Sequence, residues 1–192
     1  MINAQTASHL VDAAVEALEN GASSFRELLD GIPAAIYVTD RNGAITYFNQ
    51  ACVDLAGRTP EIGVDKWCVT WRLRTVDGKH LPHDQCPMAV ALRDGVAVRD
   101  VEAIAERPDG NLVHFIPFPT PLFDAAGNLT GAVNLLMDVT EQHKPDYLRA
   151  QANACRRLAA ETTDENTAET LQLMAAKYDQ HSLRYPRRKS RR

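Results

Sequence analysis

Two groups of strand-like segments, each divided by turn residues, limit the folds that this 192-residue chain can adopt. In the first group, residues 34–39 and 44–48 flank Asp40-Arg-Asn-Gly43, where Asn and Gly tolerate the positive φ of a tight hairpin turn. Hairpin-linked strands with helices between the groups favour an α+β fold, in which helices cover one face of an antiparallel sheet. The second group has three expected strands, 96–107, 111–122 and 129–138, separated by turn-rich sequences.

Helical segments connect and flank the strands. Asn49 is expected to cap a short helix over 50–56, and Asp84 or Gln85 to introduce a helix over 87–93. A glycine directly follows the first of these helices and is expected to end it. The remaining expectations are helices at 4–20, from Ser24 to Gly31, at 146–161 and at 165–183, and a small hairpin or irregular excursion within 58–83.

Several segments resemble a PAS sensory domain. Residues 40–49, DRNGAITYFN, resemble its first hairpin, and residues 129–141, LTGAVNLLMDVTE, resemble its last strand and the exit into a signalling helix. Residues 83–92 and 106–110 resemble PAS sensors fused to bacterial histidine kinases. The resemblance implies a five-stranded antiparallel sheet with short helices on one face. The expected organisation is an N-terminal flanking helix (1–23), a PAS domain (24–142), a C-terminal helical segment (143–183) and a basic tail (184–192).

The resemblance also selects the strand face that would line a ligand cavity. Tyr37 and Asn134 would orient a small molecule within an otherwise apolar pocket. Met88 and Leu92, spaced four residues apart on a short helix, would close the far side. The same side chains could instead fill a solid core, and both alternatives stay open. The strand residues on this face are Tyr37, Thr39, Phe115, Pro117, Pro119, Ala132, Asn134 and Leu136.

The sequence does not identify a cofactor. The Asn-Cys-Arg-Phe-Leu-Gln-like motif of flavin-binding relatives is missing, and His83, which borders the element that binds haem in some relatives, is more typical of a solvated or capping residue. His80, His83 and Cys86 offer only three local metal ligands, and a cap at Asp84 with a buried Cys86 explains the segment equally well. The chain has four widely spaced cysteines without a CxxC pair, which predict reduced, mostly buried thiols: Cys52, Cys68, Cys86 and Cys155.

Enzymatic and membrane functions have no support in the sequence. It contains no Gly-rich phosphate loop, Gly-x-Ser-x-Gly or His-Glu-x-x-His motif, and the roughly 50 residues after the PAS-like segment are too few for an ATP-binding domain. Its apolar stretches are far shorter than the roughly 18–20 residues of a membrane span, and the N-terminus lacks the features of a signal peptide. The expectation is a non-enzymatic cytoplasmic protein.

The expected function is signal transduction in a bacterial two-component system. A small ligand, or dimerisation, would alter the helix that follows Asp138-Val-Thr140 and pass the change to a separate histidine kinase or response regulator. Lys144-Pro145 would be the joint, because proline interrupts a helix. Ile36 and Val38 on the outer sheet face would contribute to a homodimer interface. The alternative is a structural dimerisation or adaptor module with a filled core and no ligand.

The charge distribution argues against nucleic-acid binding by the folded part. The whole chain has a formal net charge of −4, but its last nine residues hold six basic side chains and no acidic one, so residues 1–183 carry a net charge of −10. Such an acidic body repels phosphate groups. Any role in binding nucleic acid is therefore confined to the tail, for which a solubilising function is the simpler interpretation.

Overall fold

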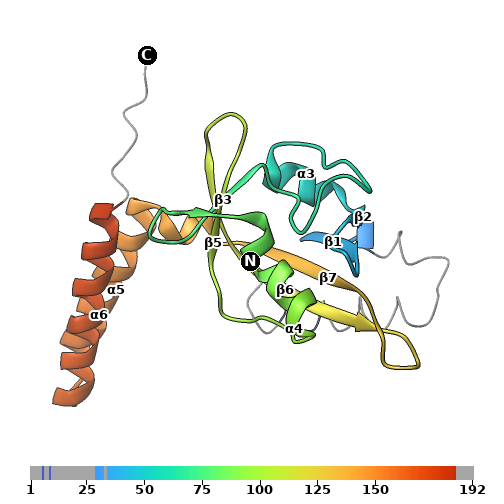
Figure 1. Ribbon diagram of the computed structural model, residues 1–192. Helices are drawn as coiled ribbons and strands as arrows, with labels where there is room; N and C mark the ends of the chain where they lie inside the picture. Colours follow the sequence, from blue (N-terminus) through green and yellow to red (C-terminus); the bar gives the residue numbers. More distant parts are fainter. Residues whose placement is uncertain (1–5, 7–8, 10–28, 33, 185–192) are drawn as a thin grey trace. The chain divides into compact units, whose positions relative to one another are not determined.

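The computed structural model describes residues 6, 9, 29–32 and 34–184, which form two compact units divided between Asp138 and Val139 (Figure 1). The first unit is built on one antiparallel sheet with the strand order β2-β1-β7-β6-β5-β3-β4. Its elements are β1 (Ala35–Asp40), β2 (Ile45–Phe48), α3 (Gln50–Ala56), β3 (Arg72–Arg74), β4 (His80–Leu81), the 3-10 helix η1 (His83–Gln85), α4 (Pro87–Asp94), β5 (Ala103–Glu106), β6 (Leu112–Phe123) and β7 (Leu129–Asp138).

The α+β class and the helices on one sheet face are confirmed, but the strand number is wrong: the sheet has seven strands rather than five. The two additional strands, β3 and β4, form the small hairpin that was one of the two expectations for residues 58–83. β3 pairs with β5, and Arg74 donates two hydrogen bonds to Glu106 Oε2, at 2.8 and 2.6 Å. Because Leu73 is also buried, this hairpin extends the sheet rather than lying over it.

The expected strand over 96–107 is also wrong, because β5 occupies only its last part. The cause lies in β6, which has three prolines at alternate positions: Pro117, Pro119 and Pro121. Val98 N donates to Pro119 O at 3.2 Å, so this side of β6 faces the segment before β5. The N–H and C=O of one strand residue point to the same side, and proline has no N–H, so the edge offers carbonyls but few donors. Instead of a ladder of backbone hydrogen bonds, the Arg99 side chain donates to Pro119 O at 3.0 Å.

Local capping and turn chemistry explain the short elements. Asn49 caps α3 as expected: its Oδ1 accepts from Cys52 N, and Gly57 ends the helix in the left-handed conformation. Asn49 also accepts from Ile36 N and donates to two further carbonyls, so one buried amide holds the start of α3 against β1. For α4 the expectation fails in detail, because Cys86 occupies the N-cap position instead of Asp84 or Gln85 and makes no side-chain cap bond.

The inner face of the sheet carries the core. α3 packs against β1, and α4 packs against β6 and β7, on the same side of the sheet (Figure 1). Alternation along the strands places the core-facing residues at every second position. The cluster therefore crosses four neighbouring strands of the sheet and the helix above them. Its members include Ala35 and Tyr37 of β1, Ala132 and Leu136 of β7, Phe115 of β6, Ala103 of β5, and Met88 and Leu92 of α4.

The second unit is a pair of helices that lie side by side, α5 (Pro145–Glu161) and α6 (Glu165–Arg184), preceded by the 3-10 helix η2 (Thr140–His143) (Figure 1). They meet around Ala152, Cys155 and Ala175, and Arg156 pairs with Asp179 across the helices. Lys144 is extended and Pro145 opens α5, so η2 and α5 are separate helices, as the Lys144-Pro145 joint requires.

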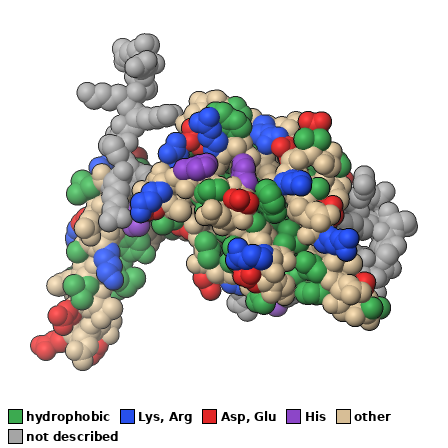
Figure 2. Space-filling view, in the orientation of Figure 1, with side chains coloured by type: hydrophobic (Ala, Val, Ile, Leu, Met, Phe, Trp, Pro, Cys, Tyr) green, Lys and Arg blue, Asp and Glu red, His purple; other side chains and the backbone are tan. Residues whose placement is uncertain are grey.

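Three expectations fall wholly or mostly outside the described residues: the helix at 4–20, the start at Ser24 of the next expected helix, and the tail after Arg184. Among the helices that the structure describes, none is long and apolar enough to cross a membrane. Figure 2 shows acidic and basic side chains interspersed over the visible face, which is the mixed pattern of an ordinary protein surface.

Candidate functional site

A chain of hydrogen bonds crosses the core of the first unit. Register places Tyr37 of β1 directly opposite Asn134 of β7, with both side chains on the inner face. Asn134 Oδ1 accepts from Phe118 N at 2.9 Å, and Asn134 Nδ2 donates to the Tyr37 hydroxyl at 3.0 Å. Tyr37 in turn donates to the carbonyl of Trp67 at 2.8 Å. The chain thus joins the three strands β6, β7 and β1 to a segment that lies outside the sheet.

The two polar residues that we expected to orient a ligand therefore satisfy each other. Tyr37 and Asn134 are 0% and 1% exposed. Burial raises the pKa of the Tyr37 phenol well above its usual range, so the hydroxyl stays protonated and remains a donor. Both side chains therefore already make internal hydrogen bonds inside the core.

Trp67 has a strained backbone. Its φ of 62° lies in the left-handed region, which a bulky side chain rarely adopts, and Cys68 N donates to Lys66 O at 2.7 Å across it. A three-residue turn of this hand is rare and strained. Trp67 N also donates to Gly43 O at 2.7 Å, which ties the turn to the β1–β2 hairpin. Strain of this kind persists where the surroundings fix it, and it concentrates at functional sites.

The Trp67 indole lies against Gly43. A Cβ built on Gly43 would come within 2.4 Å of Cδ1 and Nε1 of the indole, and Gly43 has a φ of +80°. Only glycine allows this contact at this backbone angle. The hairpin turn that the sequence predicts therefore has a second role, because it seats the aromatic ring of a residue 24 positions later.

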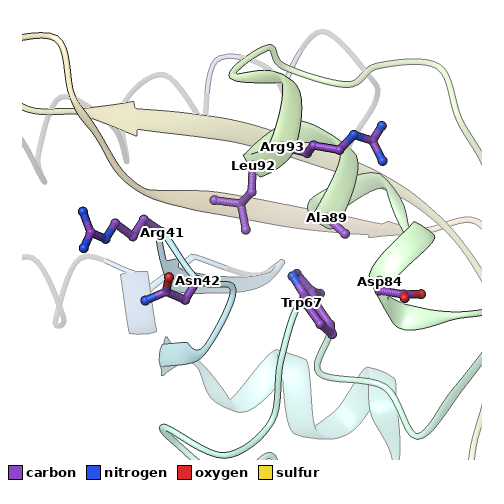
Figure 3. A pocket seen from close by; sticks show the side chains of 7 residues that line it. All are labelled: Arg41, Asn42, Trp67, Asp84, Ala89, Leu92 and Arg93. Atoms are coloured by element: carbon purple, nitrogen blue, oxygen red, sulfur yellow. The ribbon is translucent and has the colours of Figure 1, made fainter.

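Beside the indole is a hollow of about 260 Å³ between the β1–β2 turn and α4 (Figure 3). Arg41, Asn42 and Trp67 line one side. Ala89, Leu92 and Arg93 of α4, with Asp84 of η1, line the other. In Figure 3 the Leu92 side chain points from α4 into the space above Asn42 and Trp67, and the indole nitrogen lies at the end of the ring that faces Leu92.

Of the predicted ligand-binding residues, Leu92 is the one that lines this hollow. Tyr37, Met88, Phe115 and Leu136 belong to the packed core cluster. The structure places the others on the same inner face by their register, namely Thr39, Pro117, Pro119, Ala132 and Asn134, and all are buried. The Thr39 hydroxyl is buried and lacks a hydrogen-bond partner among the described residues. The binding role of these residues stays a prediction.

Sequence reasoning missed the residues that shape the hollow, above all Trp67. It lies in the segment 58–83, which lacks periodicity, and no local pattern brings it to Gly43. The one available signal was a tryptophan in an irregular segment, since large aromatic side chains there need a partner surface. Arg41 and Asn42 were recognised only as turn residues.

Three of the four predicted free thiols lie in the core around Tyr37: Cys52, Cys68 and Cys86. The Cys52 thiol donates to Ile36 O at 3.2 Å, and Cys68 Sγ accepts from the Thr70 hydroxyl at 3.2 Å. Burial raises the pKa of all three thiols, for Cys86 to about 12. They are therefore protonated near neutral pH and are poor nucleophiles.

The local metal-ligand set does not converge. In the part of the chain that the structure describes, His80, His83 and Cys86 do not bring their ligand atoms within 4.8 Å of one another. The Cys86 thiol instead lies 3.9 Å from Trp67 O. Burial, with a smaller contribution from Arg58, lowers the pKa of His83.

The outer-face residues expected at a dimer interface are not available in the single chain. Ile36 and Val38 are 0% and 7% exposed. A homodimer built on this face would need other residues, so the dimer stays a prediction without a described interface.

Comparison with known proteins gives a family. A family model described as PAS fold matches residues 29–144, which is more than half of the chain. An uncharacterized protein of Sinorhizobium fredii, y4lL, is 29% identical over 139 residues. That match covers 71% of this chain but only 16% of the relative, so the chain spans about a sixth of that protein's length.

Solved structures with a similar fold come from several organisms. The LOV protein of Rhodobacter sphaeroides is 13% identical, with 85% of this chain and 95% of that one covered and a TM-score of 0.47. A PAS domain from Colwellia psychrerythraea is 21% identical, with 65% and 98% covered and a TM-score of 0.46. The PAS domain of the fruit-fly ELK potassium channel is 20% identical, with 64% and 97% covered and a TM-score of 0.48.

Proposed function

The chain belongs to the PAS fold family, and from that premise we propose that its first unit is a sensory module that takes a small molecule into the hollow beside Trp67. One observation carries the proposal: Trp67 belongs both to the wall of the hollow and to the hydrogen-bonded chain through Tyr37 and Asn134. Asn134 is on β7, the strand that ends at Asp138 where the second unit begins. Occupation of the hollow would therefore act on the strand that leads out of the domain.

The strained turn supplies the second conformation that such a relay needs. A ligand shifts an equilibrium only by the difference between its affinities for two states. Strain at one residue costs about 1–3 kcal/mol, so relaxing the Trp67 turn recovers part of the free energy of a rearrangement. If the turn moves, Tyr37 loses its acceptor and Asn134 gains freedom to change its bond to Phe118 N. The change then reaches the pairing of β6 with β7.

The output in this proposal is a change in η2 and α5, which a separate histidine kinase or response regulator would read. The break at Pro145 allows η2 to move without bending α5. The protein itself would be non-enzymatic and would work as a homodimer.

A second function has an observation in its favour. The core residues expected to line a cavity pack against one another, and the Tyr37–Asn134 pair is satisfied internally. A structural dimerisation or adaptor module, with no ligand, needs nothing more. The two functions differ in one expectation: in the sensory module, filling the hollow changes the hydrogen bonding of β7, and in the structural module it does not.

A tethered group tests this without knowledge of the natural ligand. Asn42→Cys places a thiol at the hollow, and reaction with benzyl methanethiosulfonate then fills the hollow with a phenyl group. The native thiols are buried, so the introduced one reacts first. The matched control is Ala125→Cys, labelled in the same way, in the exposed turn between β6 and β7. Hydrogen–deuterium exchange of the full chain is measured on both labelled proteins.

The sensory function predicts that the label beside Trp67 changes exchange at residues 134–144 several-fold, and that Tyr37→Phe in the same chain abolishes the change. The label at the control turn should leave these residues unaffected. Identical exchange in both labelled proteins would favour the structural module and reject the relay.

A further inference from the structure

The hollow has the size of a small molecule, and its described walls are apolar at the centre. Leu92 and Ala89 from α4 face the Trp67 ring (Figure 3). At about 260 Å³ the hollow lies just below the roughly 300–1,000 Å³ of typical small-molecule pockets, which indicates a small occupant. A flavin or a haem is much larger than that. The apolar body of an occupant would be about one six-membered ring, which can stack on the indole or meet it edge to face.

The polar groups around the hollow are mainly hydrogen-bond donors that have no partner among the residues that the structure describes. The Trp67 indole N–H faces the hollow and makes no hydrogen bond within the described part of the chain (Figure 3). Arg41 at the rim likewise has no ion pair or hydrogen bond among the described residues. Arg93 differs, because its guanidinium is paired with Asp94 at 2.8 Å and points away from the hollow (Figure 3).

The charge balance favours an anion. Lys66 Nζ lies 5.9 Å from the centre of the Trp67 ring and adds a second cation to that of Arg41. Asp84 is the acidic group in the lining, and Figure 3 shows its carboxylate directed outward, away from the indole. Near the hollow there are therefore two cations, Arg41 and Lys66, that have no ion pair among the described residues, against the one carboxylate of Asp84. An indole N–H and a guanidinium both donate hydrogen bonds, so the complementary group on a ligand is a carboxylate.

We propose that the hollow binds a small planar aromatic carboxylate, with its ring between Leu92 and Trp67 and its carboxylate at the rim beside Arg41. This rests on the proposed sensory function and names the chemical class of its ligand. Arg41 extends outward in Figure 3 and is exposed, so it must turn toward the rim to meet the anion. Asn42, the neighbouring residue of the turn, can donate from its amide to the second carboxylate oxygen.

The probes are benzoate, its neutral counterpart benzamide, and the non-planar cyclohexanecarboxylate. Trp71→Phe leaves Trp67 as the single tryptophan of the full chain, and its fluorescence is titrated with each probe. Saturation-transfer NMR on the chain without substitutions gives a second measurement that does not depend on this variant. We expect saturable binding of benzoate that is at least tenfold tighter than binding of either other probe.

Arg41→Gln tests the anion contact. It should weaken benzoate about five- to tenfold and leave benzamide unchanged, because the amide has no charge to lose. The control is Arg149→Gln, which removes the same charge from an exposed position in the second unit and should change neither affinity. Equal binding of benzoate and benzamide, tighter binding of cyclohexanecarboxylate, no binding of benzoate, or an Arg41→Gln chain with unchanged benzoate affinity would each overturn the proposal.

The ligand class and the sensory function fail separately. If the tethered phenyl group changes exchange at β7 but benzoate shows no preference, the aromatic carboxylate is wrong and the sensory function stands. If benzoate binds as expected but the tether leaves β7 unchanged, the hollow is a binding site without the relay.

Discussion

Replacing Tyr37 by phenylalanine removes one hydroxyl and leaves two partners, the buried Asn134 Nδ2 and the half-buried Trp67 O, without their bonds at 3.0 and 2.8 Å. Tyr37 is fully buried and Asn134 nearly so. A buried polar group that loses its partner costs about 1–3 kcal/mol. The Cys86 thiol, a weak donor, stays 3.9 Å from Trp67 O. The cost of the bond lost at Trp67 O should therefore lie at the lower end of this range. We therefore expect a loss of about 2–4 kcal/mol in the free energy of unfolding, against a total of about 5–15 kcal/mol for a typical domain.

Urea unfolding followed by tryptophan fluorescence measures this loss in the first unit, because both tryptophans lie there. With a slope of about 1–3 kcal/mol per molar urea, the midpoint should fall by roughly 1–2 M. Tyr47→Phe is the matched control, since the Tyr47 hydroxyl donates to the carboxylate of exposed Asp30 at 2.6 Å, where water can replace it. A loss below about 1 kcal/mol for Tyr37→Phe, or one no larger than that of the control, would contradict the account of the core chain.

Three further predictions concern the same unit. Gly43→Ala should destabilise more than Gly78→Ala: both glycines have positive φ, at a shared cost of about 1–2 kcal/mol, but only the first meets Trp67, so its tryptophan emission should also shift. Asn49→Ala should cost about 3–5 kcal/mol in urea unfolding, because it leaves the α3 cap and three other buried backbone groups without partners. Burial raises the pKa of Cys86 to about 12, so the unfolded thiol, near 8.5, ionises first. The free energy of unfolding should then fall above about pH 8.5, by up to about 1.4 kcal/mol per pH unit for each such thiol. In urea unfolding measured between pH 8 and 10.5, the Cys86→Ala chain should therefore lose stability less steeply with pH, by the contribution of one thiol.

Local chemistry made part of the fold predictable from the sequence. The hairpin turn at Asn42 and Gly43, the cap at Asn49 and the end of α3 at Gly57 depend on residues within a few positions of one another. The error at 96–102 has the opposite origin. Nothing within that segment forbids a strand, and the prolines that deny it hydrogen-bond donors lie about twenty residues away on β6. The residues of a segment do not indicate whether the strand beside it will offer hydrogen-bond donors.

The candidate site, too, was predictable where it depends on local pattern and not where it depends on distant residues. Strand alternation with the family resemblance placed Tyr37 and Asn134 on the inner face, which the register of β1 with β7 bears out. Whether two such side chains point into a cavity or bond to each other depends on pairing between residues 97 positions apart, which alternation does not encode. Because they bond to each other, we propose that a ligand is recognised not at the centre of the domain but at its rim, where Trp67 and Arg41 have donors without partners among the described residues. In that proposal the hydrogen bonds through Tyr37 and Asn134 do not hold the ligand; they are the internal bonds that a ligand at the rim would change.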